Sequence, residues 1–326
     1  MTFSLMKRYT AIAVFFAITA PMNVSSFTAT MWQEAPAMQR TVPSKNEGVE
    51  IELPDFDELF NRIQQVSPLA RLAMEGGTGG FANADYKTPK NLKWKNISVK
   101  KNSIVHHIDK IDNFQGLGCP IVRFRSSLKG PCAGHKFASF IMDLEERKKW
   151  DPQIKEVDET YPIYDTEAAN LAMGVGKYGD CNKLGIGYCQ TKSNIVVDGR
   201  EQLTLCGIQD FASGATLIWG TEMEETHNHL LPDCERHTRA KSHLFSTCLV
   251  PSGPDSFDVE YVLQLEIGGN IPGFLTQPIL VETVKSLFNH AKKIFQDEEE
   301  MAPYLKNEED LKNDFLDEKH SLLMTP

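Results

Sequence analysis

The strongest hydrophobic pattern in the chain lies near its C-terminal end, where a two-residue repeat gives way to a helical repeat. Apolar residues alternate with polar ones from Val259 to Ile267, which predicts a strand with one buried face. From about Pro278 to Phe295 apolar residues recur every three or four positions, so this segment is predicted to be an amphipathic helix. Thr276 is its expected N-cap. The question for the rest of the chain is what the apolar face of this helix covers.

A second helical pattern precedes the central part of the chain. Apolar residues from Leu53 to Met74 form one stripe, with an interruption near Ser67 and Pro68. The polar face of this helix is not basic, which favours packing against the protein over binding to a membrane surface. The glycine run from Gly76 to Gly80 ends the helix and predicts a flexible linker.

The segment between these two patterns predicts a series of short strands. They are expected at Trp94–Val99, Ile104–Ile108, Pro120–Ser126, Tyr188–Val197, Arg200–Gln209, Ala215–Glu225 and His237–Val250. Asp198 and Gly199 predict a two-residue hairpin turn. Short helices are expected at Cys132–Met142 and Asp143–Pro152. Serial hairpins followed by one long helix predict an α+β protein, in which a curved antiparallel sheet packs on the C-terminal helix.

Composition and charge narrow the possible partners. The chain has 326 residues and a formal net charge of −10, which argues against a nucleic-acid partner because there is no basic stripe to neutralise phosphates. Residues 297–326 contain ten Asp or Glu and three Lys, and they are expected to form a solvated acidic tail.

The N-terminus has the features of a targeting signal. Lys7 and Arg8 precede an apolar run and then the small residues at 24–26, so residues 1–26 are predicted to be a signal peptide. With Phe27 directly after this expected cut, the region resembles the bipartite plastid-targeting signal of diatoms and related algae. That resemblance implies a transit peptide at 27–46 and import into a plastid through the secretory pathway. A plain secretory signal or an uncleaved anchor, and thus a secreted or endomembrane-lumen location, is the alternative. The seven scattered cysteines, which form no regular disulfide framework, favour a reducing compartment.

Several motifs in the central region resemble those of one lipid-binding family. The run from Ser139 to Val157 reads SFIMDLEERKKWDPQIKEV, and Arg200-Glu201, Arg239-Ala240-Lys241 and the run from Ile271 to Leu275 follow it in order. Together they resemble the steroidogenic acute regulatory protein-related lipid-transfer domain, called START, over residues 85–296. The resemblance implies the helix-grip fold, with one lipid held between the sheet and the C-terminal helix, which serves as a lid.

The resemblance also implies a set of lipid-binding residues and partners. The expected lipid contacts are Arg200, Thr204, Cys206, Trp219, Tyr261, Leu263, Leu280, Val284, Leu287 and Phe288. Several sterol-binding members of the family have an arginine where Cys206 stands, so a sterol is not specifically implied. The expected partners are a phospholipid, a sterol or another membrane lipid and, transiently, a membrane surface. The chain is expected to be a monomer without a cofactor. The expected domain organisation is a helix with its linker at 47–80, the lipid-binding domain at 85–296 and the acidic tail at 297–326.

Two local patterns suggest other chemistry but lack the necessary context. Gly174, Gly176 and Gly179 match the spacing of a dinucleotide fingerprint, but no strand–helix–strand unit surrounds them. They fall in an apparent insertion, residues 164–187, and the motif itself is expected to form a mobile loop, at the cavity mouth if the fold is as predicted. His227, His229, Cys234 and His237 are metal-ligand residue types at an expected hairpin tip, where solvation is the simpler interpretation, and no metal site is predicted. No catalytic constellation is found, so the chain is predicted not to be an enzyme.

Three alternatives remain open from the sequence. The strand and the helix could pack on each other as an ordinary filled core, because periodicity does not distinguish a filled core from a hollow one. An enzyme of the polyketide cyclase or aromatase type would share the helix-grip fold and would need polar side chains in its cavity. A lipid-sensing module would use the acidic tail to contact a partner. A void between the sheet and the helix would favour lipid binding over the filled core.

Overall fold

The computed structural model describes residues 40–43, 48–51 and 53–295, except 88, 90, 98, 102–103, 130–136, 139–140, 142–143, 162–165, 194–197, 233–235, 270 and 272. The predicted signal peptide, most of the predicted transit peptide, the acidic tail and most of the expected helix at 132–142 therefore lie outside the described residues.

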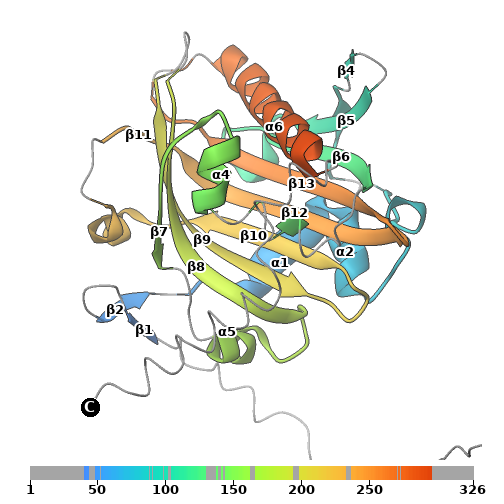
Figure 1. Ribbon diagram of the computed structural model, residues 1–326, viewed down its shortest axis with the longest axis horizontal. Helices are drawn as coiled ribbons and strands as arrows, with labels where there is room; N and C mark the ends of the chain where they lie inside the picture. Colours follow the sequence, from blue (N-terminus) through green and yellow to red (C-terminus); the bar gives the residue numbers. More distant parts are fainter. Residues whose placement is uncertain are drawn as a thin grey trace, which may run out of the picture. The chain divides into compact units, whose positions relative to one another are not determined.

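An antiparallel sheet dominates the described residues (Figure 1), in the order β3-β5-β6-β13-β12-β10-β9-β8-β7. Its strands are β3 (Lys95–Asn96), β4 (Val99–Lys101), β5 (Ile104–Ile111), β6 (Ile121–Lys129), β7 (Ile154–Tyr161), β8 (Asp180–Thr191), β9 (Arg200–Asp210), β10 (Thr216–Glu222), β11 (Thr238–Arg239), β12 (Lys241–Gly253) and β13 (Ser256–Glu266). β4 pairs with β5, and the short β11 pairs with β9 in parallel. A separate hairpin consists of β1 (Arg40–Pro43) and β2 (Gly48–Ile51).

Helices cover both faces of the sheet (Figure 1). They are α1 (Phe56–Val66), α2 (Pro68–Met74), α4 (Leu144–Trp150), α5 (Thr166–Met173) and α6 (Gly273–Phe295), with 3-10 turns η1 (Gly80–Ala82), η2 (Phe114–Gly116) and η3 (Glu225–Leu230). We call the face that carries α6 the inner face and the face that carries α1 and α2 the outer face. Each face has its own hydrophobic core. This arrangement confirms the predicted α+β helix-grip fold.

The N-terminal helices pack on the outer face, as their apolar stripe predicts. The Asp55 carboxylate caps α1 by accepting the Glu58 backbone N–H at 3.0 Å. Ser67 caps α2, whose first residue is Pro68, so the predicted interruption divides two capped helices. Phe60 and Ile63 are fully buried in the outer core. The two helices therefore gain their stability from burial against the sheet.

The outer face changes the interpretation of β13. Its alternating pattern predicts one solvent-exposed face, but Glu260 and Gln264 on that face are 0% exposed. The prediction is wrong because α1 and α2 cover these positions. The Ser67 hydroxyl donates to Glu260 Oε1 at 2.6 Å, and the Leu69 backbone N–H donates to the same oxygen at 2.9 Å. A polar residue in a strand can thus contact a capped helix instead of water.

The glycine run after α2 is bound to the sheet, which differs from the flexible linker that its composition predicts. The Phe81 N–H donates to Asp258 Oδ2 on β13 at 2.6 Å. Gly80 is buried and has a φ of +56°, and a Cβ at this position would lie 2.3 Å from the same carboxylate oxygen. Glycine is required here both by the backbone conformation and by this close approach.

The hairpin between β8 and β9 is longer than predicted. The two strands pair as far as Gln190 and Glu201, so residues 192–199 form the connection and the expected two-residue turn is wrong. β8 begins at Asp180, inside the expected insertion, and α5 precedes it. Gly185 and Gly187 fall in the predicted insertion, yet both lie in an antiparallel ladder with β9.

The C-terminal helix begins earlier than its sequence signals predict. α6 starts at Gly273, so Thr276 is not its N-cap and Pro278 lies inside the helix. The helix extends to Phe295, where the described residues end, so its predicted end at this residue stays a prediction. The helix crosses the inner face, with its apolar side toward β6 and β13.

Candidate functional site

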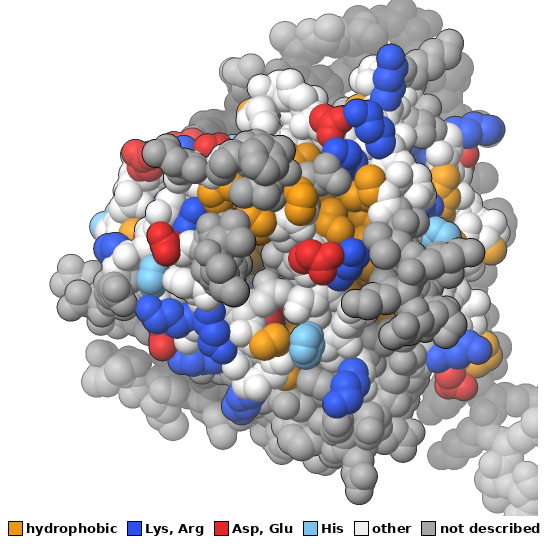
Figure 2. All heavy atoms as spheres, turned by 90° about the horizontal axis from the view of Figure 1, so that it is seen from above, with side chains coloured by type: hydrophobic (Ala, Val, Ile, Leu, Met, Phe, Trp, Pro, Cys, Tyr) orange, Lys and Arg blue, Asp and Glu red, His pale blue; other side chains and the backbone are white. Residues whose placement is uncertain are grey.

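A cavity lies between the inner face of the sheet and α6. The cavity has a volume of about 180 Å³, counted as the space open to the centre of a water-sized sphere. On the same measure, one water molecule needs roughly 10–15 Å³. The cavity walls come from β8, β9, β10, β12, β13 and α6, with α4 and the start of β7 at one side. The space under α6 is therefore hollow, which contradicts the filled-core alternative. Figure 2 shows hydrophobic side chains gathered near the centre of one face, with charged groups around them.

Six of the ten expected lipid-contact residues line this cavity. They are Thr204, Cys206, Tyr261, Leu263, Val284 and Leu287. They come from two strands that are distant in the sheet and from the helix above them. The structure thus brings together side chains from three separate segments around one void.

Two further expected residues, Leu280 and Phe288, are buried beside the cavity without lining it. The Phe288 ring stacks on Phe124 with ring centres 4.4 Å apart, and it meets Tyr261 edge-on at 5.4 Å. Leu280 is 1% exposed in the same core. α6 is therefore packed at both of these positions, and the void opens between them, at Val284 and Leu287.

Arg200 does not line the cavity and instead connects backbone segments. Its guanidinium donates to the carbonyl oxygens of Ile267 at 2.7 Å, Asp198 at 2.7 Å and Gly268 at 3.2 Å. Burial lowers the pKa of Arg200 below its usual value, with a partial compensation from Asp198. These contacts join the start of β9 to the chain that leaves β13 toward α6.

Arg200→Ala is expected to lower the free energy of unfolding by about 2–3 kcal/mol, because buried carbonyl groups lose a charged donor. Urea unfolding measures this change. Lipid uptake per folded chain should be unchanged, since Arg200 lies away from the cavity. Normal stability combined with a loss of uptake would show that the guanidinium contacts lipid after all.

Trp219 lies on the outer face, although it was expected in the lipid site. Its indole contacts Phe56 and Phe60 of α1 edge-on, with ring centres 5.8 and 5.9 Å apart. A Cβ on Gly207 would come within 2.4 Å of this indole. Ile218, the preceding residue, lines the cavity instead. Neighbouring strand residues point to opposite faces, so an assignment displaced by one residue exchanges a cavity wall for an outer-core position.

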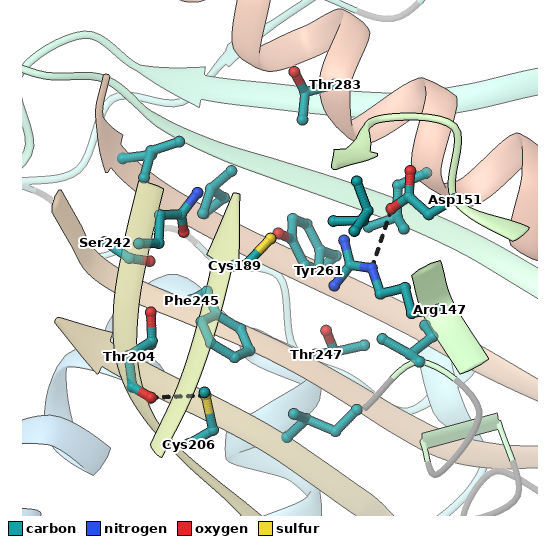
Figure 3. Close-up of a pocket in the computed structure, with 18 of the residues that line it drawn as sticks. Arg147, Asp151, Cys189, Thr204, Cys206, Ser242, Phe245, Thr247, Tyr261 and Thr283 are labelled. Atoms are coloured by element: carbon teal, nitrogen blue, oxygen red, sulfur yellow. Dashed lines mark hydrogen bonds and ion pairs between the residues drawn. The ribbon is translucent and has the colours of Figure 1, made fainter. Parts of the chain in front are cut away.

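The sequence reasoning missed an ion pair at the cavity wall. Arg147 Nε donates to Asp151 Oδ2 at 3.1 Å, and Asp151 Oδ1 accepts the Gln153 N–H at 3.0 Å. Both charged residues line the cavity, and the guanidinium points toward Tyr261 and Cys189 (Figure 3). Burial lowers the pKa of Arg147, but Asp151, together with the neighbouring Cys189 and Tyr261, more than offsets this, so the net pKa lies above the usual value. The available signal was the four-residue spacing of opposite charges just before Pro152.

Most of the other polar side chains that line the cavity are uncharged, and they do not form a cluster. Burial raises the pKa of Cys189 to about 11 and that of Tyr261 to about 12, so both are protonated at neutral pH. Hydroxyl groups of Thr204, Ser242, Thr247 and Thr283 are distributed around the wall (Figure 3). Among the described lining residues, Arg147, Asp151 and Lys183 carry charge. We call the side of the cavity at Arg147 and Asp151 its charged end. Lys183 lies elsewhere on the wall, near the start of β8, and the rest of the wall is mainly apolar or bears neutral polar groups.

The other candidate sites remain separate from this cavity. Among the described residues, no group of three or more His, Cys, Asp or Glu could hold a metal ion. The rings of His227 and His229 lie 6.3 Å apart in η3, His237 contacts Lys155, and Cys234 lies outside the described residues. The glycine motif at 174–179 joins α5 to β8, where Lys177 pairs with Asp57 at 2.8 Å. A search of the described helices finds none that is long and apolar enough to cross a membrane.

Comparisons with solved structures place this arrangement among known folds. Human STARD10 aligns with a TM-score of 0.51 and 13% identity over 78% of this chain and 87% of that chain. Human StAR-related lipid transfer protein 5 aligns with a TM-score of 0.51 and 13% identity over 73% of this chain and 96% of that chain. Neither a scan against family models nor a search of curated proteins finds a match. At this level of identity the structural likeness establishes the fold, and the chain has the helix-grip fold of the StAR-related lipid-transfer domains.

Proposed function

We propose that this protein binds one lipid in the cavity under α6 and transfers it between membranes. The observation that carries the proposal is the void of about 180 Å³ between α6 and the sheet, lined largely by apolar side chains. The fold is shared with human StAR-related lipid transfer protein 5, which supports the same assignment here.

The physical role of such a cavity is to shield hydrocarbon from water. Exposing a lipid tail costs about 0.8 kcal/mol per methylene, so a chain of about 15 methylenes costs roughly 12 kcal/mol. A closed apolar cavity removes most of this barrier. Because Val284 and Leu287 of α6 form one wall, exchange requires movement of α6 or of a neighbouring loop.

The charged end of the cavity favours a lipid with an acidic oxygen in its head group. Arg147 can donate to a phosphate or carboxylate through its planar guanidinium, while Asp151 holds its Nε. In a buried site a charged group needs a partner of opposite sign, so an acidic head group would be placed at this end. The hydrocarbon would extend toward Phe245 and Leu263.

The enzyme alternative is less well supported by the same wall. General acid–base catalysis at neutral pH favours a group whose pKa is close to 7, whereas burial moves the pKa of Tyr261 to about 12. Asp151 is engaged by Arg147 and the Gln153 N–H. We therefore favour transport over catalysis.

Arg147→Met is expected to weaken binding of phospholipids about tenfold or more, because a hydrogen bond to a charged group contributes about 1.5–3 kcal/mol. The matched control is Lys148→Met, which removes the neighbouring charge that pairs with Glu156 on the surface. Equilibrium binding of fluorescent phospholipids to both variants measures the effect. Equal affinity in the two variants would contradict a head-group role for Arg147.

Transfer itself is tested with donor and acceptor vesicles and a panel of fluorescent phospholipids, fatty acids and sterols. The full chain should accelerate transfer of at least one class in proportion to protein concentration. Removal of residues 297–326 should leave the rate intact if transport is the function, whereas a sensor that works through its tail would lose its partner contact. Binding without any transfer would favour the sensor.

A further inference from the structure

The size of the cavity limits the lipid that it can enclose. Its volume of about 180 Å³, divided by the roughly 10–15 Å³ that one water needs on the same measure, leaves room for about 12–18 groups of that size. A methylene group is close to a water molecule in size, so one chain of about 15 methylenes fills this space. Two such chains bring about 30 methylenes before their head group is counted. The cavity therefore suits a lipid with a single hydrocarbon chain.

The lowest part of the cavity floor runs along β8 and β9. Gly185 of β8 pairs with Cys206 of β9, Gly187 pairs with Thr204, and all four residues line the cavity. The glycines have no side chain and the residues opposite them have small ones, so the two strands form a shallow trough. Neighbouring strands lie about 4.8 Å apart, and a trough two strands wide matches one hydrocarbon chain in width.

The next strands raise the floor beside this trough. Phe245 of β12 lines the cavity, and its ring covers Gly220 of β10, where a Cβ would collide with the ring. Gly220 pairs with Cys206, so the ring stands directly beside the trough. A second hydrocarbon chain would need the space that this ring fills.

The charged end suits an acid that carries one negative charge. Arg147 already pairs with Asp151, so a bound acid shares this guanidinium with a carboxylate. Each additional negative charge on the acid would therefore be less well balanced. Cys189 and Tyr261 lie beside the guanidinium and are protonated at neutral pH, so they can donate to an acidic oxygen without adding charge (Figure 3).

We propose that the ligand of this cavity is a single-chain lipid acid with one negative charge, of the fatty-acid or lysophospholipid type, whose acidic oxygens contact Arg147 and whose chain lies in the trough beside Phe245. This inference rests on the proposed function and narrows its substrate class. It excludes a two-chain lipid as the enclosed ligand.

A competition between four lipids tests the inference. The lipid-free chain is incubated with vesicles that contain equal amounts of palmitate, palmitoyl-lysophosphatidylglycerol, dipalmitoyl-phosphatidylglycerol and hexadecanol, and the bound lipid is extracted and quantified. One of the two single-chain acids should exceed both the two-chain lipid and the neutral alcohol at least about tenfold. The acid that dominates shows whether the acidic oxygen belongs to a carboxylate or to a phosphodiester.

The other outcomes separate this inference from the proposed function. A preference for dipalmitoyl-phosphatidylglycerol, or uptake of hexadecanol equal to that of the acids, would overturn the inference and leave lipid binding intact. Uptake of none of the four would also overturn it, and the absence of any lipid transfer between vesicles would overturn the proposed function as well.

Phe245→Ala gives a second readout, with a series of the preferred acid in chains of increasing length. Loss of the ring should move the preferred chain length upward by about two to six carbons, because up to six ring carbons no longer fill the cavity. Phe211→Ala is the matched control, since Phe211 is also half-buried but packs against the outer core, and it should keep the wild-type preference. Bound lipid is normalised by the folded fraction. An unchanged preference in Phe245→Ala would show that the chain does not lie beside this ring and would overturn the proposal.

Discussion

Glu260→Ala is expected to lower the free energy of unfolding by about 3–5 kcal/mol, the usual cost of removing one partner from a buried charged network. Glu260 is fully buried on β13 and accepts from the Ser67 hydroxyl and the Leu69 N–H. Its second oxygen lies 3.9 Å from Arg123 Nε. The substitution therefore leaves a helix cap and a buried guanidinium short of an acceptor. Urea unfolding followed by circular dichroism measures the change.

The control for this prediction is Glu282→Ala, which removes an exposed carboxylate that pairs with Lys285 at 2.7 Å. Exposed pairs contribute at most about 1 kcal/mol, so this variant should unfold close to the wild type. If Glu260→Ala also cost less than about 1 kcal/mol, the attachment of α1 and α2 to β13 would not depend on this carboxylate.

The pH dependence of the same residue follows from its environment. Burial raises the pKa of Glu260 above its usual value, although Arg123 and the hydrogen bonds from Ser67 and Leu69 lower it in part. Between the unfolded pKa and the raised folded pKa, the folded state binds more protons than the unfolded state. The free energy of unfolding therefore decreases as pH rises through this window. Glu260→Gln should lack this component, so the wild type should lose stability relative to Glu260→Gln as pH rises from about 4.5.

The second large effect is expected from filling the cavity. Thr204→Trp should reduce the amount of lipid bound per folded chain at least about tenfold, because the indole would occupy the void that a lipid needs. Thr204 lies on β9, with Gly187 opposite it on β8, so the wall has no bulky side chain at that position. Overpacking of a filled core costs about 1–3 kcal/mol, whereas an existing void should accommodate the ring with little loss of stability.

Thr226→Trp is the matched control, since Thr226 is exposed in η3 and does not line the cavity. It should bind lipid as the wild type does. Lipid extraction and quantification on purified variants, normalised by the folded fraction from circular dichroism, distinguish the two. Full occupancy in Thr204→Trp would mean that lipid does not use this cavity.

The helices on the outer face show why the sequence pattern predicted the fold correctly but did not predict which faces of a strand are buried. Alternation of apolar and polar residues along β13 predicted the strand. A strand that is buried on both faces can have the same alternation as a strand that is buried on one face, provided that its polar side chains form hydrogen bonds within the protein. Ser67 provides such a partner for Glu260 from a segment 193 residues away. A contact at that separation has no signal in a local pattern, so the solvent-exposed face was predicted wrongly.

The cavity-lining residues of the helix could be predicted from the sequence more reliably than those of the strands. Val284 and Leu287 follow from helical periodicity alone. Trp219 was assigned to the wrong face because a one-residue change of register exchanges the two faces of a strand. Gly185 and Gly187 were placed in an insertion, although within β8 they line the cavity without a side chain of their own. Arg147 lies in a helix that the sequence predicted, but the local pattern does not indicate that α4 faces the cavity.

Native mass spectrometry of the chain without its predicted signal peptide, purified from lipid-containing cells, tests the central claim most directly. The account predicts one non-covalent lipid per chain, which Thr204→Trp loses and Thr226→Trp keeps. A chain that emerges with no added mass, and that takes up no phospholipid, fatty acid or sterol after incubation with vesicles, would contradict it.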